Sequence, residues 1–196
     1  MYSRAYSFVL PLILLLIGAV FHGNVIDEQK QGEPESDVGM VQQAFFLKKL
    51  KPDLERVGVL WKKGAPNQER KLRSIESAAA SIQAKLFVAY VEDKSEVPEK
   101  FRLLSREHDV QALWIIENDG VVDASVPKEY LIENTVKEGI PLMAPTTSWV
   151  DAGAPFTVQE DGGKVQIMLN EPAAVATGLQ VPDEYKSRTR PIVAAE

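Results

Sequence analysis

The sequence predicts an α/β protein with a parallel sheet of about four strands in βαβαβαβ order, helices on both faces of the sheet, and a C-terminal β-hairpin. Short apolar runs rich in Val, Ile and Leu alternate with stretches of helical period, as in parallel strands joined by right-handed crossovers. Beyond residue 155, apolar and polar residues instead alternate around Asp161-Gly162-Gly163, which is typical of two antiparallel strands.

The N-terminus carries a targeting signal. Arg4 precedes an apolar run over residues 8–21, which is shorter than the roughly 20 residues that a membrane-spanning helix needs. We interpret residues 1–23 as a secretory signal peptide and expect a periplasmic or secreted protein. Because the small residues before position 24 form no clear A-x-A cleavage site, an uncleaved N-terminal anchor is the alternative. The polar residues 24–37, which contain Gly and Pro, are expected to form a linker.

The remaining residues 38–196 are enough for a single α/β domain, and 45% of the whole chain is hydrophobic. The chain has no cysteine, which excludes disulfides and thiolate chemistry, and its two histidines, His22 and His108, are too few for a His-based metal or catalytic centre. A net charge of -6 argues against a nucleic-acid partner. No cofactor and no metal are expected.

Residues 38–50 predict an amphipathic helix, because Val38, Val41 and Phe45, together with Leu47 and Leu50, recur near helical spacing and Pro52 ends the pattern. Packing of this helix against its own sheet is the simpler interpretation. Binding to a partner protein or a membrane surface is the alternative.

The domain is organised around the first predicted strand, which leads through a loop into a long helix. The predicted strands are residues 54–61, 85–91, 112–116 and 140–144. The helices between them are residues 67–82, 95–105 and 130–136. Pro66 and Glu69 fit the start of the first of these helices, Ser95 is the expected N-cap of the second, and Gly139 ends the third.

The C-terminal part follows a different pattern. Strands over residues 156–160 and 164–169 form the hairpin, and a short helix over residues 170–178 has Asn170 as its N-cap. From residue 182 onward a short strand or an ordered tail is expected.

Several of these segments resemble the mid-chain part of ABC transporter substrate-binding proteins with a type I periplasmic-binding-protein fold. The resemblance covers roughly residues 47–150 and rests on Leu47-Lys-Lys-Leu-Lys-Pro52, Arg56-Val-Gly-Val-Leu60, Pro66-Asn67, Asp109-Val-Gln-Ala-Leu-Trp-Ile-Ile-Glu-Asn-Asp119 and Gly139-Ile-Pro-Leu-Met143. It implies a non-catalytic protein that binds a small polar ligand and has a membrane permease as partner. Members of that family have two lobes that close on the ligand, and this chain has room for one. The resemblance therefore implies a half-site that another chain completes, for example in a homodimer.

From residue 156 onward, the chain is similar to small periplasmic repressors of membrane diguanylate cyclases. This similarity implies a different function, that of a periplasmic regulatory protein that binds a membrane sensor or another envelope partner.

Polar side chains follow three of the predicted strands, where parallel sheets bind their ligands. The resemblance implies that the family contacts its ligand from the same three loops. The candidate ligand-binding residues are Lys62, Asn67, Glu117, Asn118, Asp119, Thr146, Thr147, Ser148 and Trp149. The alternative is ordinary solvated loops, since Asn-Asp-Gly is also a common turn sequence.

Catalysis is not expected from these residues. Glu117 and Asp119 could act as paired carboxylates in acid–base work or bind a divalent cation, but no nucleophile or third ligand accompanies them, which favours a solvated loop. Among the tryptophans, Trp114 lies in an apolar strand and is expected in the core. Trp149 is expected on a polar loop and is the better candidate for ligand contact.

Overall fold

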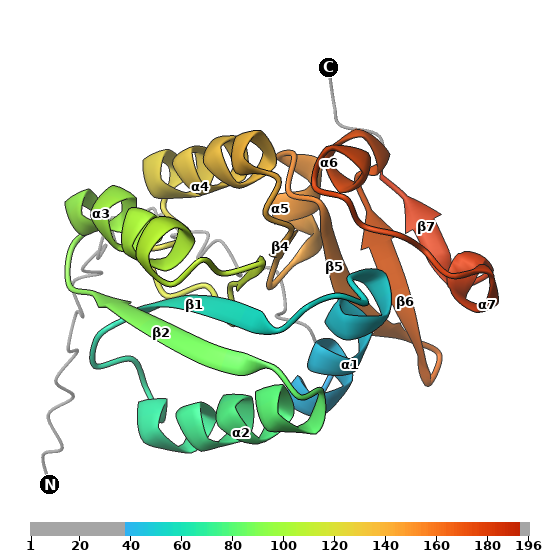
Figure 1. Ribbon diagram of the computed structural model, residues 1–196, viewed down its shortest axis with the longest axis horizontal. Helices are drawn as coiled ribbons and strands as arrows, with labels where there is room; N and C mark the ends of the chain where they lie inside the picture. Colours follow the sequence, from blue (N-terminus) through green and yellow to red (C-terminus); the bar gives the residue numbers. More distant parts are fainter. Residues whose placement is uncertain (1–37, 193–196) are drawn as a thin grey trace, which may run out of the picture. The chain divides into compact units, whose positions relative to one another are not determined.

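The structure is a computed structural model that describes residues 38–192 (Figure 1). The predicted signal peptide and linker, residues 1–23 and 24–37, lie outside the described residues. Within residues 38–192, none of the helices combines the length and the apolar character that crossing a membrane would require.

A seven-stranded sheet with the order β2-β1-β3-β4-β5-β6-β7 forms the centre of the domain. The strands are β1 Arg56–Lys62, β2 Lys85–Val91, β3 Ala112–Trp114, β4 Leu142–Met143, β5 Phe156–Asp161, β6 Lys164–Leu169 and β7 Thr189–Pro191. All neighbouring strands of this sheet pair in parallel except β5 and β6, which form the predicted antiparallel hairpin. The order β2-β1-β3-β4 is that of a parallel sheet built by crossovers in both directions from β1.

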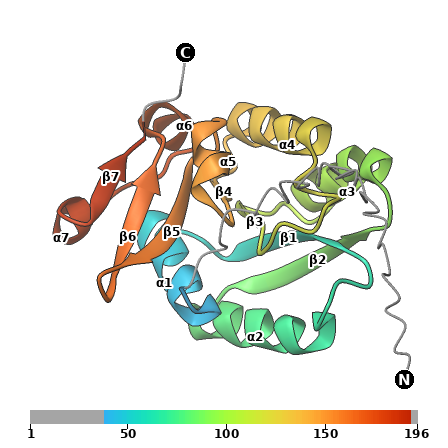
Figure 2. The same cartoon turned by 180° about the vertical axis from the view of Figure 1, so that it is seen from behind.

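The predicted parallel strands and the predicted hairpin belong to one sheet. Met143 of β4 pairs in parallel with Phe156 of β5, so the hairpin continues the sheet (Figure 2). The last segment adds the short strand β7 beside β6. The sheet is therefore mixed and larger than the four parallel strands that the apolar runs predict.

Helices cover both faces of the sheet, as predicted (Figure 1). They are α1 Met40–Leu50, α2 Gln68–Ser81, α3 Val97–Arg102, α4 Ser125–Glu138, α5 Thr147–Asp151, α6 Glu171–Ala176 and α7 Asp183–Lys186. A 3-10 turn, Lys94–Glu96, precedes α3, and a π-helical segment, Leu103–Glu107, follows it. α1 and α2 pack on one face, whereas α3, α4 and α5 pack on the other.

β1 separates two apolar clusters. Val57, Val59 and Trp61 belong to the cluster under α1 and α2, whereas Leu60 belongs to the cluster under α3 and α4. This alternation follows from the two-residue period of a strand. Gly58, which points to the α3 side, allows Val110 to approach closely. β1 is therefore buried on both faces, which explains its continuous apolar sequence.

α1 packs on its own sheet, as predicted, with part of the predicted apolar stripe. Its buried residues include Leu47 and Leu50, and Gln43 accepts a hydrogen bond from Nε1 of Trp114 at 3.0 Å. Val41 and Phe45, two members of the predicted apolar stripe, are instead 52% and 41% exposed. Val38, Leu47 and Leu50 of the predicted stripe are thus buried, whereas Val41 and Phe45 are not.

The predicted helix ends are partly correct. Gly139 ends α4 with φ of 69°, and the Asn170 side chain accepts from the Ala173 N–H at 3.1 Å as the expected N-cap of α6. Ser95 is not an N-cap, because Asp93, two residues earlier, caps the 3-10 turn before α3 and accepts from the Ser95 N–H at 2.9 Å. α4 begins at Ser125 instead of at residue 130.

Candidate functional site

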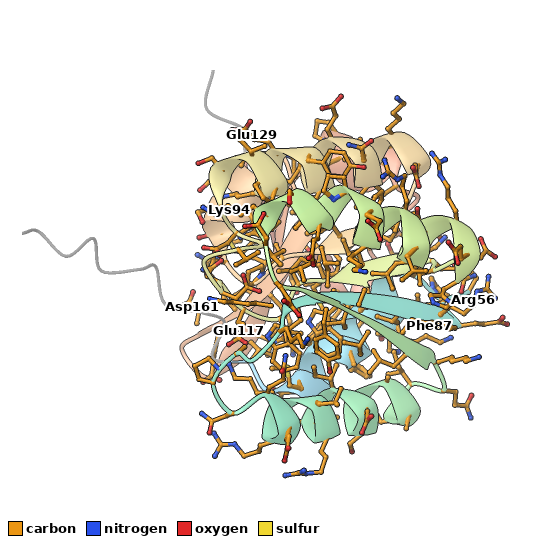
Figure 3. The ribbon with its side chains drawn as sticks, turned by 90° about the vertical axis from the view of Figure 1, so that its left-hand side faces the viewer. Arg56, Phe87, Lys94, Glu117, Glu129 and Asp161 are labelled. Carbon is orange, nitrogen blue, oxygen red and sulfur yellow. The ribbon has the colours of Figure 1, made fainter. Side chains whose placement is uncertain are left out.

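The loops after β1 and β3 and the helix after β4 lie at the carboxyl ends of parallel strands. We call these three segments, residues 62–67, 117–119 and 146–149, the rim. In Figure 3, Glu117 of the rim and Arg56, at the start of β1, lie toward opposite sides of the view. The geometry of the rim is set by a small number of hydrogen bonds between its segments.

Asp119 joins the loop after β3 to the end of β1. Its Oδ2 accepts from the Lys62 N–H at 2.9 Å, and its Oδ1 accepts from the N–H groups of Val121 and Val122 at 2.8 and 2.7 Å. A carboxylate with three backbone donors is held in one orientation. Asp119 therefore shapes the rim.

Glu117 is a buried residue of the rim, with 8% of its surface exposed, so the interpretation as a solvated loop carboxylate is wrong for this residue. Its Oε1 accepts from Nε1 of Trp61 at 2.5 Å, and its Oε2 pairs with the ammonium group of Lys71. Burial of a carboxylate is costly unless it is paired and hydrogen-bonded, and both conditions are met here. Glu117 and Asp119 thus have separate partners and do not form a carboxylate pair.

The prediction that Trp149 lies on a polar loop is wrong. Trp149 belongs to the short helix α5, where it is 1% exposed. Its Nε1 donates to Oδ1 of Asn118 at 3.1 Å, which ties α5 to the loop after β3. Lys128 of α4 covers the ring, with Nζ at 5.4 Å from the ring centroid, and also donates to the Ser148 carbonyl. Trp114 is in the core, as predicted.

The remaining predicted residues differ in their exposure. Thr146 is buried, and its hydroxyl lies 2.9 Å from that of Ser148, which is exposed. Thr147 and Lys62 are half-buried. Asn67 is exposed in the left-handed conformation that precedes α2, with φ of 57°.

Gln68 fixes the loop between Lys62 and Asn67. Its Nε2 donates to the Lys62 carbonyl at 2.8 Å and its Oε1 accepts from the Gly64 N–H at 3.0 Å. The two amide atoms thus close the loop on itself. This loop is consequently ordered by its own residues before any ligand is considered.

Two neighbouring residues, Asn118 and Asp119, therefore bring the three rim segments together, one reaching α5 and the other β1. Sequence reasoning missed Lys71, which compensates the charge of Glu117, and Lys128, which covers the ring of Trp149. Lys71 lies four residues after Asn67, on the turn of α2 nearest the rim, and this spacing is the signal that could have revealed it.

In the described range 38–192, no three His, Asp or Glu side chains converge into a group that could hold a metal ion. Three surface hollows of about 540, 250 and 380 Å³ lie elsewhere, and none of them is lined by a rim residue. The rim offers amide, hydroxyl and ammonium groups around the buried Glu117, whose charge Lys71 compensates.

A family model described as ABC transporter substrate binding protein matches residues 31–168. The chain belongs to this family. This family consists of non-catalytic solute-binding proteins.

Solved structures support the fold. A domain from Streptococcus pneumonia in complex with L-Trp matches with a TM-score of 0.66 and 16% identity, over 79% of this chain and 62% of that chain. A conserved domain protein from Vibrio cholerae gives a TM-score of 0.67 and 18% identity, over 80% and 61%. The ligand-free, open form of a substrate-binding protein with adhesive properties from Clostridium difficile matches with a TM-score of 0.66 and 15% identity. This match covers 81% of this chain and 61% of that chain.

This family member thus spans only 61 to 62% of the length of those three structures. No curated protein matches it.

Proposed function

We propose that this chain is an exported, non-catalytic binding protein that recognises a small polar ligand at the rim and serves an ABC transporter. Family membership supports the transport role, and the location of the rim at parallel strand ends supports the site. The observation that carries the proposal is that Asn118 and Asp119 join the three rim segments into one surface.

The rim residues divide into two roles in this proposal. Glu117, Asp119, Thr146 and Trp149 position the surface, because each is buried or holds a neighbouring segment. The proposed ligand contacts come from the more exposed or half-buried residues Lys62, Asn67, Asn118, Thr147 and Ser148. An ammonium group with amides and hydroxyls suits a ligand that carries a carboxylate and further hydrogen-bonding groups.

We infer that a complementary part completes this surface around a ligand. The chain spans 61 to 62% of the length of the structures that it resembles, which leaves room for a complementary part. A second copy in a homodimer, or a membrane permease, would supply it. Ligand-dependent dimerisation in sedimentation experiments would identify the first arrangement.

Calorimetry and thermal-shift measurements with the purified protein test the ligand proposal. A relative was solved with L-Trp, so aromatic amino acids lead a panel that also holds other amino acids, aromatic acids and sugars. We expect one class to stabilise the protein and Asn118→Ala to weaken that effect, whereas Asn134→Ala on α4 serves as the matched control. Lack of stabilisation by every compound at millimolar concentration would refute the proposal.

Export is part of the proposal and rests on the apolar run over residues 8–21. Fractionation of cells that express the full chain should place it in the periplasm or on the outer side of the membrane. A protein found only in the cytoplasm would contradict this expectation.

A second candidate function is that of an envelope regulator that binds a membrane sensor. The exposed Val41 and Phe45 on α1 favour it, because neighbouring exposed apolar side chains mark interaction surfaces. Cross-linking in cells discriminates between the two functions. Recovery of only the monomer would exclude the regulator.

A further inference from the structure

A groove lies between the start of α1 and the middle of α2, on the face of the sheet that these helices cover. Its volume is about 540 Å³, and it is lined by residues 39–42 and by Arg70, Arg73, Ser74 and Ser77. The four α2 residues are spaced three and four apart and therefore share one face of the helix. That face forms one wall of the groove, and the first turn of α1 forms the other.

The α2 wall is positively charged. Within residues 38–192, neither Arg70 nor Arg73 forms an ion pair, although Glu69 and Glu76 belong to the same helix. Guanidinium groups bind carboxylates through two parallel hydrogen bonds. The charge of this wall therefore fits an anionic partner.

The α1 wall contains Met40 and Val41 beside the polar Gln42, and the exposed apolar surface of α1 extends past the groove. Val41 in the groove is 52% exposed, and Phe45, one turn further, is 41% exposed. The other exposed large hydrophobic residues of the described chain, Val126 and Val175, stand singly on α4 and α6. α1 alone thus presents two exposed apolar side chains on adjacent turns of one helix.

We propose that the groove binds an acidic amphipathic segment of a partner protein, with its apolar side chains on Val41 and Phe45 and its carboxylates on Arg70 and Arg73. Amphipathic helices commonly bind grooves between helices through side chains spaced by one turn. The exposed apolar side chains of α1 run from Val41 in the groove to Phe45 outside it. They therefore fit an extended occupant better than a small molecule. This surface is separate from the rim, and its test does not depend on the rim ligand.

The test uses the purified full chain and two fluorescently labelled helical peptides with the same apolar face. One peptide carries Glu at its polar positions, and the other carries Lys at those positions. Fluorescence anisotropy should show binding of the Glu peptide that weakens with added salt, and much weaker binding of the Lys peptide. The variant R70E/R73E should lose about tenfold or more in affinity for the Glu peptide and gain affinity for the Lys peptide.

Matched variants control for net charge and for folding. R102E/K137E makes the same charge change at two exposed basic residues of α3 and α4, away from the groove and from Phe45, and should bind as the unchanged protein does. V41S/F45S should lose binding, whereas V126S/V175S should retain it. Circular dichroism checks that each variant is folded.

Three results would overturn the proposal. They are no binding of the Glu peptide at millimolar concentration, equal binding by R70E/R73E and R102E/K137E, and binding to vesicles of anionic phosphatidylglycerol without binding to the Glu peptide. The last result would assign the groove to a lipid surface.

Discussion

Nε1 of Trp61 donates to Oε1 of Glu117 at 2.5 Å and joins the end of β1 to the end of β3. Both side chains are buried, and Lys71 supplies the positive charge that balances the carboxylate. The rim is thus built on a polar contact inside an apolar layer, where each lost partner leaves a buried group unsatisfied.

Replacing Glu117 by Ala should destabilise the protein by about 2–3 kcal/mol, because it leaves the Trp61 N–H without its acceptor and Lys71 without its counter-ion. Glu117→Gln should cost less, since its carbonyl oxygen still accepts from Trp61. Urea unfolding at pH 7 measures the difference. Glu129→Ala on the exposed side of α4 is the control and should stay within about 0.5 kcal/mol of the original protein.

Replacing Asp119 by Ala should lower the free energy of unfolding by about 1–3 kcal/mol, because three backbone N–H groups lose the carboxylate that accepts their hydrogen bonds. The same variant should weaken ligand binding at the rim, since the end of β1 is released from the loop after β3. Urea unfolding and calorimetry check the two effects. Asp151→Ala, at an exposed position of α5, should change neither. Full stability of Asp119→Ala would show that these hydrogen bonds have no structural role.

Gly58→Ala should destabilise the protein by about 1–3 kcal/mol through overpacking. A methyl group there would lie 3.2 Å from Val110 and 3.3 Å from Leu104, both buried between the sheet and α3. Gly39→Ala is the control, because its added methyl group has nothing within 4 Å among the described residues beyond its chain neighbours. Thermal unfolding compares the two variants, and equal melting temperatures would contradict the packing argument.

Asp93 gives the stability a dependence on acidic pH. The Ser95 N–H donates to its carboxylate and holds the pKa of Asp93 below the ordinary value of 3.8. A carboxyl group with a lowered native pKa stabilises the fold above pH 3.8 and loses this contribution as the pH falls through the native pKa. Asp93→Ala should therefore melt earlier than the original protein at pH 7, and the difference should shrink in acid below pH 3.8.

Asp93→Asn tests the same explanation, because the amide oxygen can still accept the hydrogen bond but does not titrate. This variant should retain the cap at pH 7 and show no acid loss from this position. A difference between Asp93→Ala and the original protein that is constant from pH 7 to acid would contradict the assignment.

Helices, strands and caps were predictable where residues close in the sequence carry a periodic pattern or a capping side chain. β2, the hairpin and the Asn170 cap are of this kind. The cap at Ser95 was mistaken, because Asp93 has an equally suitable side chain two residues earlier and the sequence does not rank the two.

The rim could be predicted as a location but not as a set of contacts. The alternation of strands and helices places residues after β1, β3 and β4 at one end of the sheet, which the bonds of Asn118 and Asp119 confirm as one connected surface. Burial of Glu117 and Trp149 depends on Lys71, Trp61 and Lys128, which are distant in the chain. α5 was missed because five residues are too few to show a helical period.

The way in which β7 ends affects how the protein behaves at high concentration. β7 forms one edge of the sheet, is only three residues long and finishes at Pro191, which has no N–H to offer to an incoming strand. Aggregation by addition of strands is therefore discouraged at this edge. β2, with seven residues at the opposite edge, is where such self-association would begin in a destabilised variant.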